Sequence, residues 1–421
     1  AEPGADLKVS HAPTLPSLSD VRQRMTGKRL ASDGFDRIVT DIAAGLYSDI
    51  HLAAFISACS TLSLDIDEIT SLTGAMVNVG EQLDWNTDMV IDKHCVGGLP
   101  GNRTTPIVVA ILASLGLTIP KTSSRAITSP AGTADTMETL TQVDLSLPDI
   151  RRVVETEGGC LAWGGAVQLS PADDILIRIE RALDIDAEGQ LIASVLSKKI
   201  AAGASHVVLD LPVGPTAKLR SAAGARALAQ HMTIVARGFG LKTHCVVSDG
   251  LQPVGRGIGP ALEAWDVLRV LQRSKSAPPD LRERALTLAG AALELAGRAK
   301  PDTGAAMAQD ALDNGSAWSK FQAICAAQGG LREPPRAAQT APVAAIRSGV
   351  LKAIDNRKLS RLAKLAGAPE RPAAGLTVHK RLGEQITIGE PLLTIHAEAS
   401  GEIDYAMSYA HANAGLFTIE G

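Results

Sequence analysis

Apolar residues recur at helical spacing through the first part of the chain. Between residues 19 and 85 they follow one another three or four positions apart, as in Leu52, Phe55 and Ile56. This period is typical of helices that bury one face, so the segment predicts a small helical domain. Residues 1–18 are rich in Pro, Ser and Ala without such a period, which predicts a linker or a disordered end.

The middle of the chain alternates between two patterns. Short apolar runs at 206–211 and 242–247 predict buried strands, whereas 106–115 and 222–237 have helical spacing. Strands that alternate with helices favour a parallel sheet covered by helices, and ligands bind such sheets at the carboxyl ends of the strands. The pattern therefore predicts a large α/β domain.

From about Pro342 the pattern changes to short strands that Gly and Pro interrupt. The runs that fit are 349–354, 376–379, 385–388 and 392–396. We expect a C-terminal mixed domain whose role is packing and assembly.

Composition narrows the class of protein. A chain of 421 residues is too long for one core and predicts two or three domains. Its net charge of −4 argues against a nucleic-acid or anionic-membrane partner. No apolar run is long enough to predict a membrane-spanning helix, and no signal peptide is visible. The cysteines have neither paired nor zinc spacing, which predicts reduced thiols in a cytoplasmic protein without a metal: Cys59, Cys95, Cys160, Cys245 and Cys325.

Two loops have the composition of an anion site. The first, Asp92–Thr105, contains glycines that allow backbone N–H groups to approach a ligand, and the helix predicted after it adds a positive helix end. The second, Lys121–Asp135, supplies hydroxyls and positive side chains. An ordinary turn is the alternative for either loop, and neither is a Walker loop or a Rossmann fingerprint. Composition and spacing predict a phosphate site and no more.

Three motifs in order carry a resemblance to a known family. They are Lys93-His94-Cys95-Val96-Gly97-Gly98, Lys121–Ser129 with Ala131-Gly132-Thr133, and Ser194–Lys199. They resemble the nucleoside phosphorylases of the thymidine phosphorylase and AMP phosphorylase family, from about Ser19 to the C-terminus. The resemblance implies an α/β protein with a small helical domain, a large α/β domain (the type II nucleoside phosphorylase fold) and a C-terminal mixed α/β domain, assembled as a homodimer.

The resemblance also implies the domain limits. After the end at 1–18, we expect the helical domain at 19–85 and 169–202, the second piece being the base side. The α/β domain then occupies 86–168, its phosphate-binding part, and 203–340, and the C-terminal mixed domain occupies 341–421. AMP phosphorylases have a further N-terminal domain and this chain lacks an initiator Met, so we expect a trimmed form of a longer protein.

The resemblance assigns the phosphate side. The implied cradle consists of Lys93, Gly98, Ser123, Thr133 and Thr105, with Thr104 as an alternative to Thr105 and His94 beside them as a catalytic residue. Cys95 departs from a serine of the thymidine-specific enzymes, and a thiol is a weaker donor than a hydroxyl. The run that implies further substrate contacts is Ser124, Arg125, Ala126, Ile127, Thr128 and Ser129.

The base side distinguishes the two branches of the family. Thymidine phosphorylases use an arginine, a serine and a lysine against the pyrimidine. Ser194 and Lys198 match the last two, but Ile179 stands at the place of the arginine. AMP phosphorylases use an aspartate as proton donor, which Asp186 matches, and a lysine on the 5′-phosphate, which Lys218 matches.

Each assignment has a simpler alternative. Asp186 suits a helix N-cap, Lys218 and Arg220 suit a solvated pair, and His94 suits a hydrogen-bonded loop histidine. Asp173 and Asp174 resemble a loop cap before a helix, and a metal role there has no third ligand.

Three hypotheses for a pentosyltransferase follow. The first is phosphorolysis of a nucleoside 5′-monophosphate to free base and ribose 1,5-bisphosphate. The alternatives are a thymidine or pyrimidine nucleoside phosphorylase, which gives base and (deoxy)ribose 1-phosphate, and a Mg²⁺-dependent phosphoribosyltransferase. For a phosphorylase we expect a nucleotide or nucleoside substrate, inorganic phosphate as co-substrate, and no cofactor.

Overall fold

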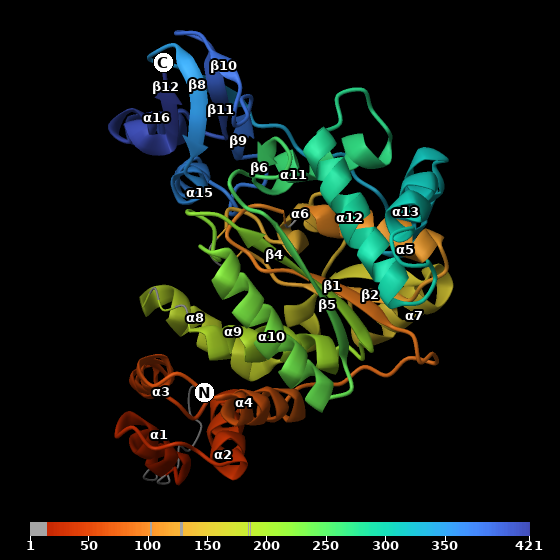
Figure 1. Ribbon diagram of the computed structural model, residues 1–421, viewed down its shortest axis with the longest axis vertical. Helices are drawn as coiled ribbons and strands as arrows, with labels where there is room; N and C mark the ends of the chain where they lie inside the picture. Colours follow the sequence, from red (N-terminus) through yellow and green to blue (C-terminus); the bar gives the residue numbers. More distant parts are fainter. Residues whose placement is uncertain (1–14, 102, 127–128, 184, 186) are drawn as a thin grey trace, which may run out of the picture.

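The computed structural model describes residues 15–421 apart from residues 102, 127–128, 184 and 186. Three parts follow one another in space (Figure 1): a helical bundle, a central sheet covered by helices, and a smaller part of strands and helices near the C-terminus. The predicted fold class, a small helical domain with a large α/β domain and a C-terminal mixed domain, is confirmed.

The helical part combines two separate pieces of the chain. It contains α1 (Ser17–Met25), α2 (Ser32–Ala43), α3 (Asp49–Thr61), α4 (Ile66–Asn78), α8 (Pro171–Leu183) and α9 (Glu188–Ala201). Phe35 and Phe55 from the first piece share a buried core with Leu176 and Ile192 from the second. The helices begin where capping favours them, as at α4, where the Asp65 side chain accepts from the Glu68 N–H at 2.9 Å. Helix α1 begins at Ser17, so the last two residues of the predicted linker are helical.

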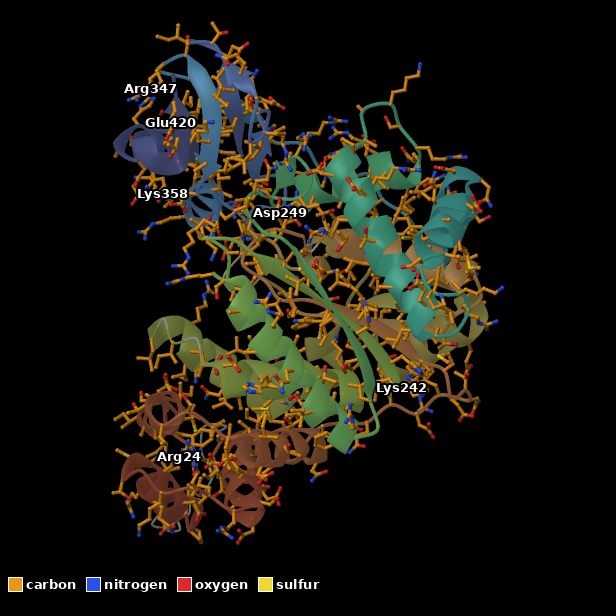
Figure 2. The ribbon with its side chains drawn as sticks, in the orientation of Figure 1. Arg24, Lys242, Asp249, Arg347, Lys358 and Glu420 are labelled. Atoms are coloured by element: carbon orange, nitrogen blue, oxygen red, sulfur yellow. The ribbon has the colours of Figure 1, made fainter. Side chains whose placement is uncertain are left out.

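Five parallel strands form the central sheet: β1 (Ile91–Cys95), β2 (Ile119–Ser123), β3 (Gly159–Trp163), β4 (His206–Val213) and β5 (Lys242–Asp249). Strand β1 pairs with β4 and β4 with β5, while β2 pairs with β3. A parallel bridge between Val90 and Thr118 joins the two groups, which gives the order β3-β2-β1-β4-β5. All carboxyl ends therefore meet at one edge, marked by Asp249, whereas Lys242 marks the opposite edge (Figure 2).

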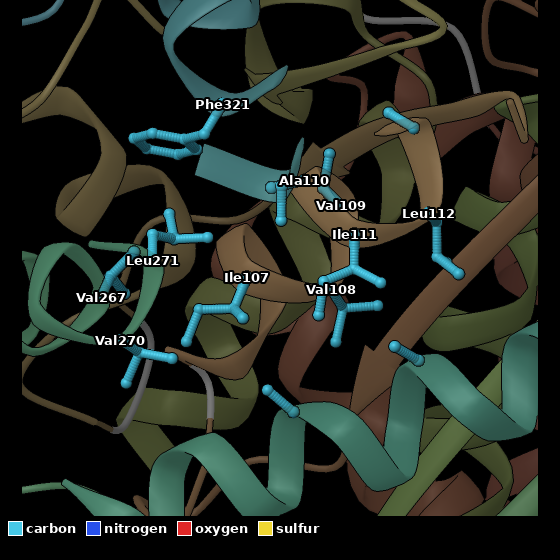
Figure 3. Close-up of a cluster of buried hydrophobic side chains, with 14 of the residues drawn as sticks. Ile107, Val108, Val109, Ala110, Ile111, Leu112, Val267, Val270, Leu271 and Phe321 are labelled. Atoms are coloured by element: carbon cyan, nitrogen blue, oxygen red, sulfur yellow. The ribbon is translucent and has the colours of Figure 1, made fainter. Parts of the chain in front are cut away.

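The helices of the α/β part are α5 (Thr104–Ser114), α6 (Thr133–Glu138), α7 (Leu147–Glu157), α10 (Ala222–Gly238), α11 (Pro260–Leu271), α12 (Pro279–Leu295), α13 (Gly304–Asp313) and α14 (Ser316–Ala327). Helix α5 is buried along its whole length from Thr104 to Ala113. Its apolar side chains pack with residues of α11 and α14, including Val267 and Phe321 (Figure 3). A helix that is apolar on all sides is expected where neighbours cover it completely, so the start of α5 has a fixed position at the sheet edge.

One prediction is wrong about local structure. Both motifs were expected to be loops from their first residue, but Asp92, Lys93 and His94 lie in β1, and Lys121 and Ser123 lie in β2. These strands pair with neighbours and bury polar side chains, which the hydrophobic pattern cannot distinguish from a loop. The loops begin after the strands, at the sheet edge.

The C-terminal part has two antiparallel sheets and two helices. The strands are β6 (Gly257–Ile258), β7 (Gln339–Ala344), β8 (Gly349–Ile354), β9 (Gly375–Val378), β10 (Gln385–Ile386), β11 (Pro391–Ala397) and β12 (Phe417–Glu420), in the orders β6-β9-β11-β7 and β10-β8-β12. The helices are α15 (Asn356–Leu365) and α16 (Ser400–Ala412), and a short 3₁₀ turn follows α16 at Ala414–Leu416; another follows β3 of the central sheet at Gly164–Val167. The predicted strands are present, whereas β6, β7, β12 and both helices were not predicted. In the described part of the chain, no helix has the length and apolar character that crossing a membrane requires.

Candidate active site

Lys93 lies at the centre of the residues predicted for the phosphate side. It is fully buried in β1, and its ammonium donates to Thr104 Oγ1 at 2.7 Å and to Thr105 Oγ1 at 3.2 Å, at the start of α5. Thr104 in turn donates to the carbonyl of Gly101 at 2.7 Å. Burial lowers the pKa of Lys93. The structure thus brings together Lys93 and both candidate threonines, beside the N–H groups of a helix end that favours anions.

Ser123 lies at the end of β2, the neighbouring strand. Its Oγ is buried and has no hydrogen-bond partner among the described residues, which leaves a hydroxyl available for a ligand. Thr133 is the first residue of α6 in the following loop. Asp135 closes that loop by accepting from the N–H groups of Ala126 at 2.6 Å and Gly132 at 2.8 Å. A Cβ at Gly132 would lie 2.4 Å from the Ser124 carbonyl oxygen, so only glycine fits there.

The rest of this loop is held mainly by its own contacts. Arg125 forms ion pairs with Glu138 and, at 3.4 Å, with Asp135, and its guanidinium lies 4.7 Å from the centre of the Trp163 ring. Ser129 donates to the Ala131 carbonyl at 3.0 Å. The charge of Arg125 is therefore balanced by two acidic residues of α6. Two further predicted contacts, Ile127 and Thr128, lie outside the described residues.

The glycine loop after β1 touches the loop after β4. Gly98 has a φ of 104°, a conformation that favours glycine, and a Cβ there would lie 3.0 Å from the backbone nitrogen of Lys218. Lys218, which the sequence assigned to a 5′-phosphate, thus lies beside the predicted phosphate cradle. The two loops come from positions about 120 residues apart, and parallel strand ends bring them together.

Helices α8 and α9 carry residues that were predicted for the base side. Ser194 Oγ donates to Asp173 Oδ2 at 2.9 Å, and Lys198 Nζ lies 2.6 Å from Asp173 Oδ2 and 3.3 Å from Asp174 Oδ1. Burial opposes the charge on Lys198, but the two carboxylates outweigh it and raise its pKa. The expectation that Asp173 and Asp174 cap a helix from a preceding loop is wrong, because both lie in the first turn of α8. They hold Lys198 instead.

Two other base-side positions have different outcomes. Ile179 is 6% exposed and packs in the core of the helical part with Leu176 and Ile192. An apolar side chain there offers no hydrogen bond to a substrate. Asp186, the predicted proton donor, lies outside the described residues, so its role stays a prediction.

His94 lies in β1 and is affected by lysines from β1, β2 and α9. It is partly exposed near the end of β1, and burial together with the charges of Lys199, Lys121, Lys93 and Lys198 places its pKa well below 6.5. The imidazole is therefore neutral at pH 7 and has one N–H donor and one acceptor nitrogen.

Two of the lysines that act on His94, Lys121 and Lys199, belong to a buried ion cluster. Asp92 Oδ1 is 3.1 Å from Lys121 Nζ, and Asp92 Oδ2 is 2.7 Å from Lys199 Nζ. The sequence motifs contained all three residues but assigned no role to Asp92 or Lys199. Their pairing joins α9 on the base side to β1 on the phosphate side.

Cys95 has a structural partner that the sequence did not indicate. Its thiol is buried and lies 3.4 Å from Asp210 Oδ2, and burial raises its pKa to about 12, so the protonated thiol donates to the carboxylate. Asp210 also pairs with Arg284 at 3.2 Å. An aspartate within the apolar run of β4 was the available signal. The thiol is thus directed to Asp210, at the position where thymidine-specific enzymes have a serine.

Comparison with known proteins defines the class of enzyme. Residues 21–80 match the helical bundle domain of a glycosyl transferase family, and residues 87–318 match the a/b domain of that family. Residues 350–416 match the pyrimidine nucleoside phosphorylase C-terminal domain. With the site described above, these domains define a pentosyltransferase.

Full-length relatives identify the family. The chain is 61% identical to a putative thymidine phosphorylase of Chelativorans sp. (strain BNC1) over 99% of its length and 82% of the relative. A putative thymidine phosphorylase of Parvibaculum lavamentivorans is 59% identical over 98% of this chain and 82% of that protein. The chain belongs to the thymidine phosphorylase and AMP phosphorylase family of glycosyl transferases.

Solved structures share the fold at low sequence identity. Anthranilate phosphoribosyltransferase from Thermus thermophilus has a TM-score of 0.61 and 19% identity over 73% of this chain and 99% of that one. The Saccharomyces cerevisiae enzyme, in complex with PRPP and Mg, has a TM-score of 0.60 and 14% identity over 74% of this chain and 97% of that one. Over the described residues of the present chain, no group of three or more His, Cys, Asp or Glu is placed to hold a metal ion.

Proposed function

We propose that the protein catalyses phosphorolysis of the N-glycosidic bond of a pyrimidine nucleoside of the thymidine type, releasing free base and (deoxy)ribose 1-phosphate. The support comes from the relatives near 60% identity and from the C-terminal domain match. These findings favour this reaction over phosphorolysis of a nucleoside 5′-monophosphate, which was the first hypothesis from the sequence. Assembly as a homodimer remains a prediction.

One observation carries the proposal: the buried ion pair of 2.7 Å between Lys199 and Asp92. Lys199 follows Lys198, a predicted base contact on α9, and Asp92 precedes Lys93, the predicted phosphate lysine on β1. The donors predicted for an anion and those predicted for a base thus lie on elements that are in direct contact. This arrangement suits a substrate that spans both, with its glycosidic bond between them.

The chemistry needs little beyond this placement. A phosphate oxygen attacks the anomeric carbon of the sugar as the bond to the base breaks, and the bonding electrons leave with the base. Lys93, Thr105 and Ser123 would orient the phosphate, whose charge balances the positive character that develops on the sugar. The departing base takes up negative charge, which the cation of Lys198 would stabilise.

Neutral His94 has a separate role in this scheme. Because the surrounding lysines oppose its protonation, it contributes hydrogen bonds rather than a positive charge. We infer that its N–H donates to the substrate on the side where the base departs, while the lysines supply the charge. With Ile179 at the arginine position, pyrimidine recognition would rely on Ser194 and Lys198.

A nucleoside 5′-monophosphate is the second candidate substrate. The observation that favours it is the contact of the Lys218 backbone with the Gly98 loop, which brings a lysine close to the cradle. The product would then be ribose 1,5-bisphosphate. In this scheme Asp186 would act as the proton donor.

Phosphate-dependent release of base from a panel of nucleosides and their 5′-monophosphates tests the proposal. We expect thymidine or uridine to release base only when phosphate is present. Release from the monophosphates alone would replace the first candidate by the second. Absence of phosphate-dependent release from every member would contradict both.

A further inference from the structure

Three charged side chains form a buried cluster behind the candidate active site. Asp92, Lys121 and Lys199 are 2%, 4% and 3% exposed, and each lysine ammonium lies within 3.1 Å of one carboxylate oxygen of Asp92. Lys121 also donates to the Thr122 carbonyl at 2.6 Å. The proposed chemistry assigns none of these three side chains a direct contact with the phosphate or the base.

The cluster connects elements from two parts of the molecule. Asp92 belongs to β1 and Lys121 to β2 of the sheet, whereas Lys199 belongs to α9 of the helical part. Successive residues on a helix point in different directions, so Lys198 meets Asp173 while Lys199 meets Asp92. Lys199 is therefore next in sequence to Lys198, a predicted base contact, and Asp92 is next to Lys93, a predicted phosphate contact.

An ion pair is a costly way to hold two elements together. Burial removes water from both charges, and packed apolar side chains of similar volume often stabilise a protein as well or better. What the ion pair adds is direction, because the ammonium must meet a particular oxygen of the carboxylate. Such a constraint suits a place where the relative position of two elements determines the reaction.

We propose that Lys199 is a positioning residue. Its ion pair with Asp92 fixes the position of α9 relative to β1. Helix α9 carries Ser194 and Lys198, and β1 carries Lys93 and His94. The inference rests on the proposed function, since it concerns the alignment of base and phosphate for transfer. Small errors of alignment are costly in such reactions, and a displacement of about 1 Å can lower turnover by roughly a hundredfold.

The charge on Lys199 makes the alignment sensitive to pH. Burial lowers the pKa of Lys199 to about 7. The negative charge of Asp92 raises this pKa, whereas the positive charge of Lys121 lowers it further. As pH rises through 7, Lys199 loses its proton and the ion pair is lost. The other charged or titratable groups around the cluster are Lys93 and His94 on β1, Cys160 on β3, Lys198 on α9, and Asp173 and Asp174 on α8.

The test compares Lys199→Met and Lys199→Arg with a matched control. Arg24→Met removes an equally buried ion pair, Arg24 to Glu68 at 2.6 Å, in the helical part away from the site (Figure 2). We expect Lys199→Met to lower kcat by about tenfold or more at pH 7, while KM for phosphate changes less. Arg24→Met should lower thermal stability and leave kcat per folded molecule unchanged.

Lys199→Arg supplies the readout that a purely structural role would not change. Arginine stays charged over the whole range, so this variant should recover part of the lost kcat. In addition, the decline of wild-type kcat above about pH 7 should move to higher pH by one unit or more.

The outcomes distinguish failure of the proposed function from failure of the positioning role of Lys199. If the wild type releases no base with phosphate from nucleosides or nucleotides, the proposed function fails and this inference with it. If the wild type is active but Lys199→Met matches Arg24→Met in kcat per folded molecule, only the positioning role fails. Should Lys199→Met not fold, the pH profile of Lys199→Arg decides, and a decline at the wild-type pH overturns the inference.

Discussion

The two sides of the candidate site are built in different ways. The phosphate side consists of strand ends, a fully buried helix start and backbone turns, with Lys93 buried and hydrogen-bonded to two threonines. The base side consists of side chains on α8 and α9, where Lys198 and Asp174 are partly exposed and held by each other. The predicted anion site is thus built mainly from the fold itself, whereas the predicted base side depends on a few side chains.

Because of this difference, the structure indicates the class of reaction more clearly than it indicates the substrate. A change at Gly132 or in α5 would disturb packing that the whole domain needs. A change such as arginine to isoleucine at position 179 only adds one apolar side chain to a helical core.

Removing the buried lysine should give the largest effect. Lys93→Ala deletes the charge at the centre of the phosphate side, and we expect a loss of about 2 to 4 kcal/mol in transition-state stabilisation, with a higher KM for phosphate. Ser123→Ala should act in the same direction through its unpartnered hydroxyl. Steady-state kinetics with varied phosphate measure both.

The opposite end of α5 provides the control. Ser114→Ala removes a hydroxyl that donates to the Ile111 carbonyl at 2.8 Å, far along the helix from Thr104, and should leave phosphate kinetics unchanged. Normal phosphate kinetics in both Lys93→Ala and Ser123→Ala would remove the basis for the phosphate side.

Substitution of Lys218 should have a smaller and selective effect. If Lys218 binds a 5′-phosphate, the nucleotide is preferred over its nucleoside by roughly ten- to a hundredfold in kcat/KM, and Lys218→Ala abolishes that preference. Arg220→Ala, at an exposed position of the same loop, is the control. Equal loss on nucleoside and nucleotide would show that Lys218 supports the cradle instead.

The smallest expected effect is on stability, and it concerns the buried pair of Arg103 and Glu263 next to the start of α5. Glu263 is buried 3.2 Å from Arg103, the residue before α5, and burial raises the pKa of this carboxyl to about 7 despite the arginine. The folded state therefore keeps a proton that the unfolded chain loses near its ordinary pKa of 4.5. It follows that stability falls as pH rises from about 4.5 to 7.

Glu263→Gln should remove this part of the pH dependence. Between pH 5 and 7 we expect the wild-type Tm to fall by a few degrees more than that of the variant, on the order of 2 to 5 °C. Glu283→Gln, at an exposed position of α12, should follow the wild type. Parallel Tm curves for wild type and Glu263→Gln would contradict the account.

The sequence predicted the two sides of the site unequally. The glycines, hydroxyls and lysines of the two motifs indicated an anion site, because such residues are enriched where backbone approaches a ligand. The strand positions of Lys93 and His94 were missed, since charged residues in a strand look like a loop until their partners are known. Lys199 pairs with Asp92 across 107 positions of sequence, and no local pattern predicts that pairing.

Product analysis with a pyrimidine nucleoside tests the central claim most directly. Incubation of the enzyme with thymidine or uridine and inorganic phosphate, followed by phosphorus NMR, should show loss of phosphate and one new sugar 1-phosphate in equal amount to the released base. A requirement for a 5′-phosphorylated nucleoside, with ribose 1,5-bisphosphate as the product, or base exchange that needs a pyrophosphorylated ribose and Mg²⁺, would contradict it.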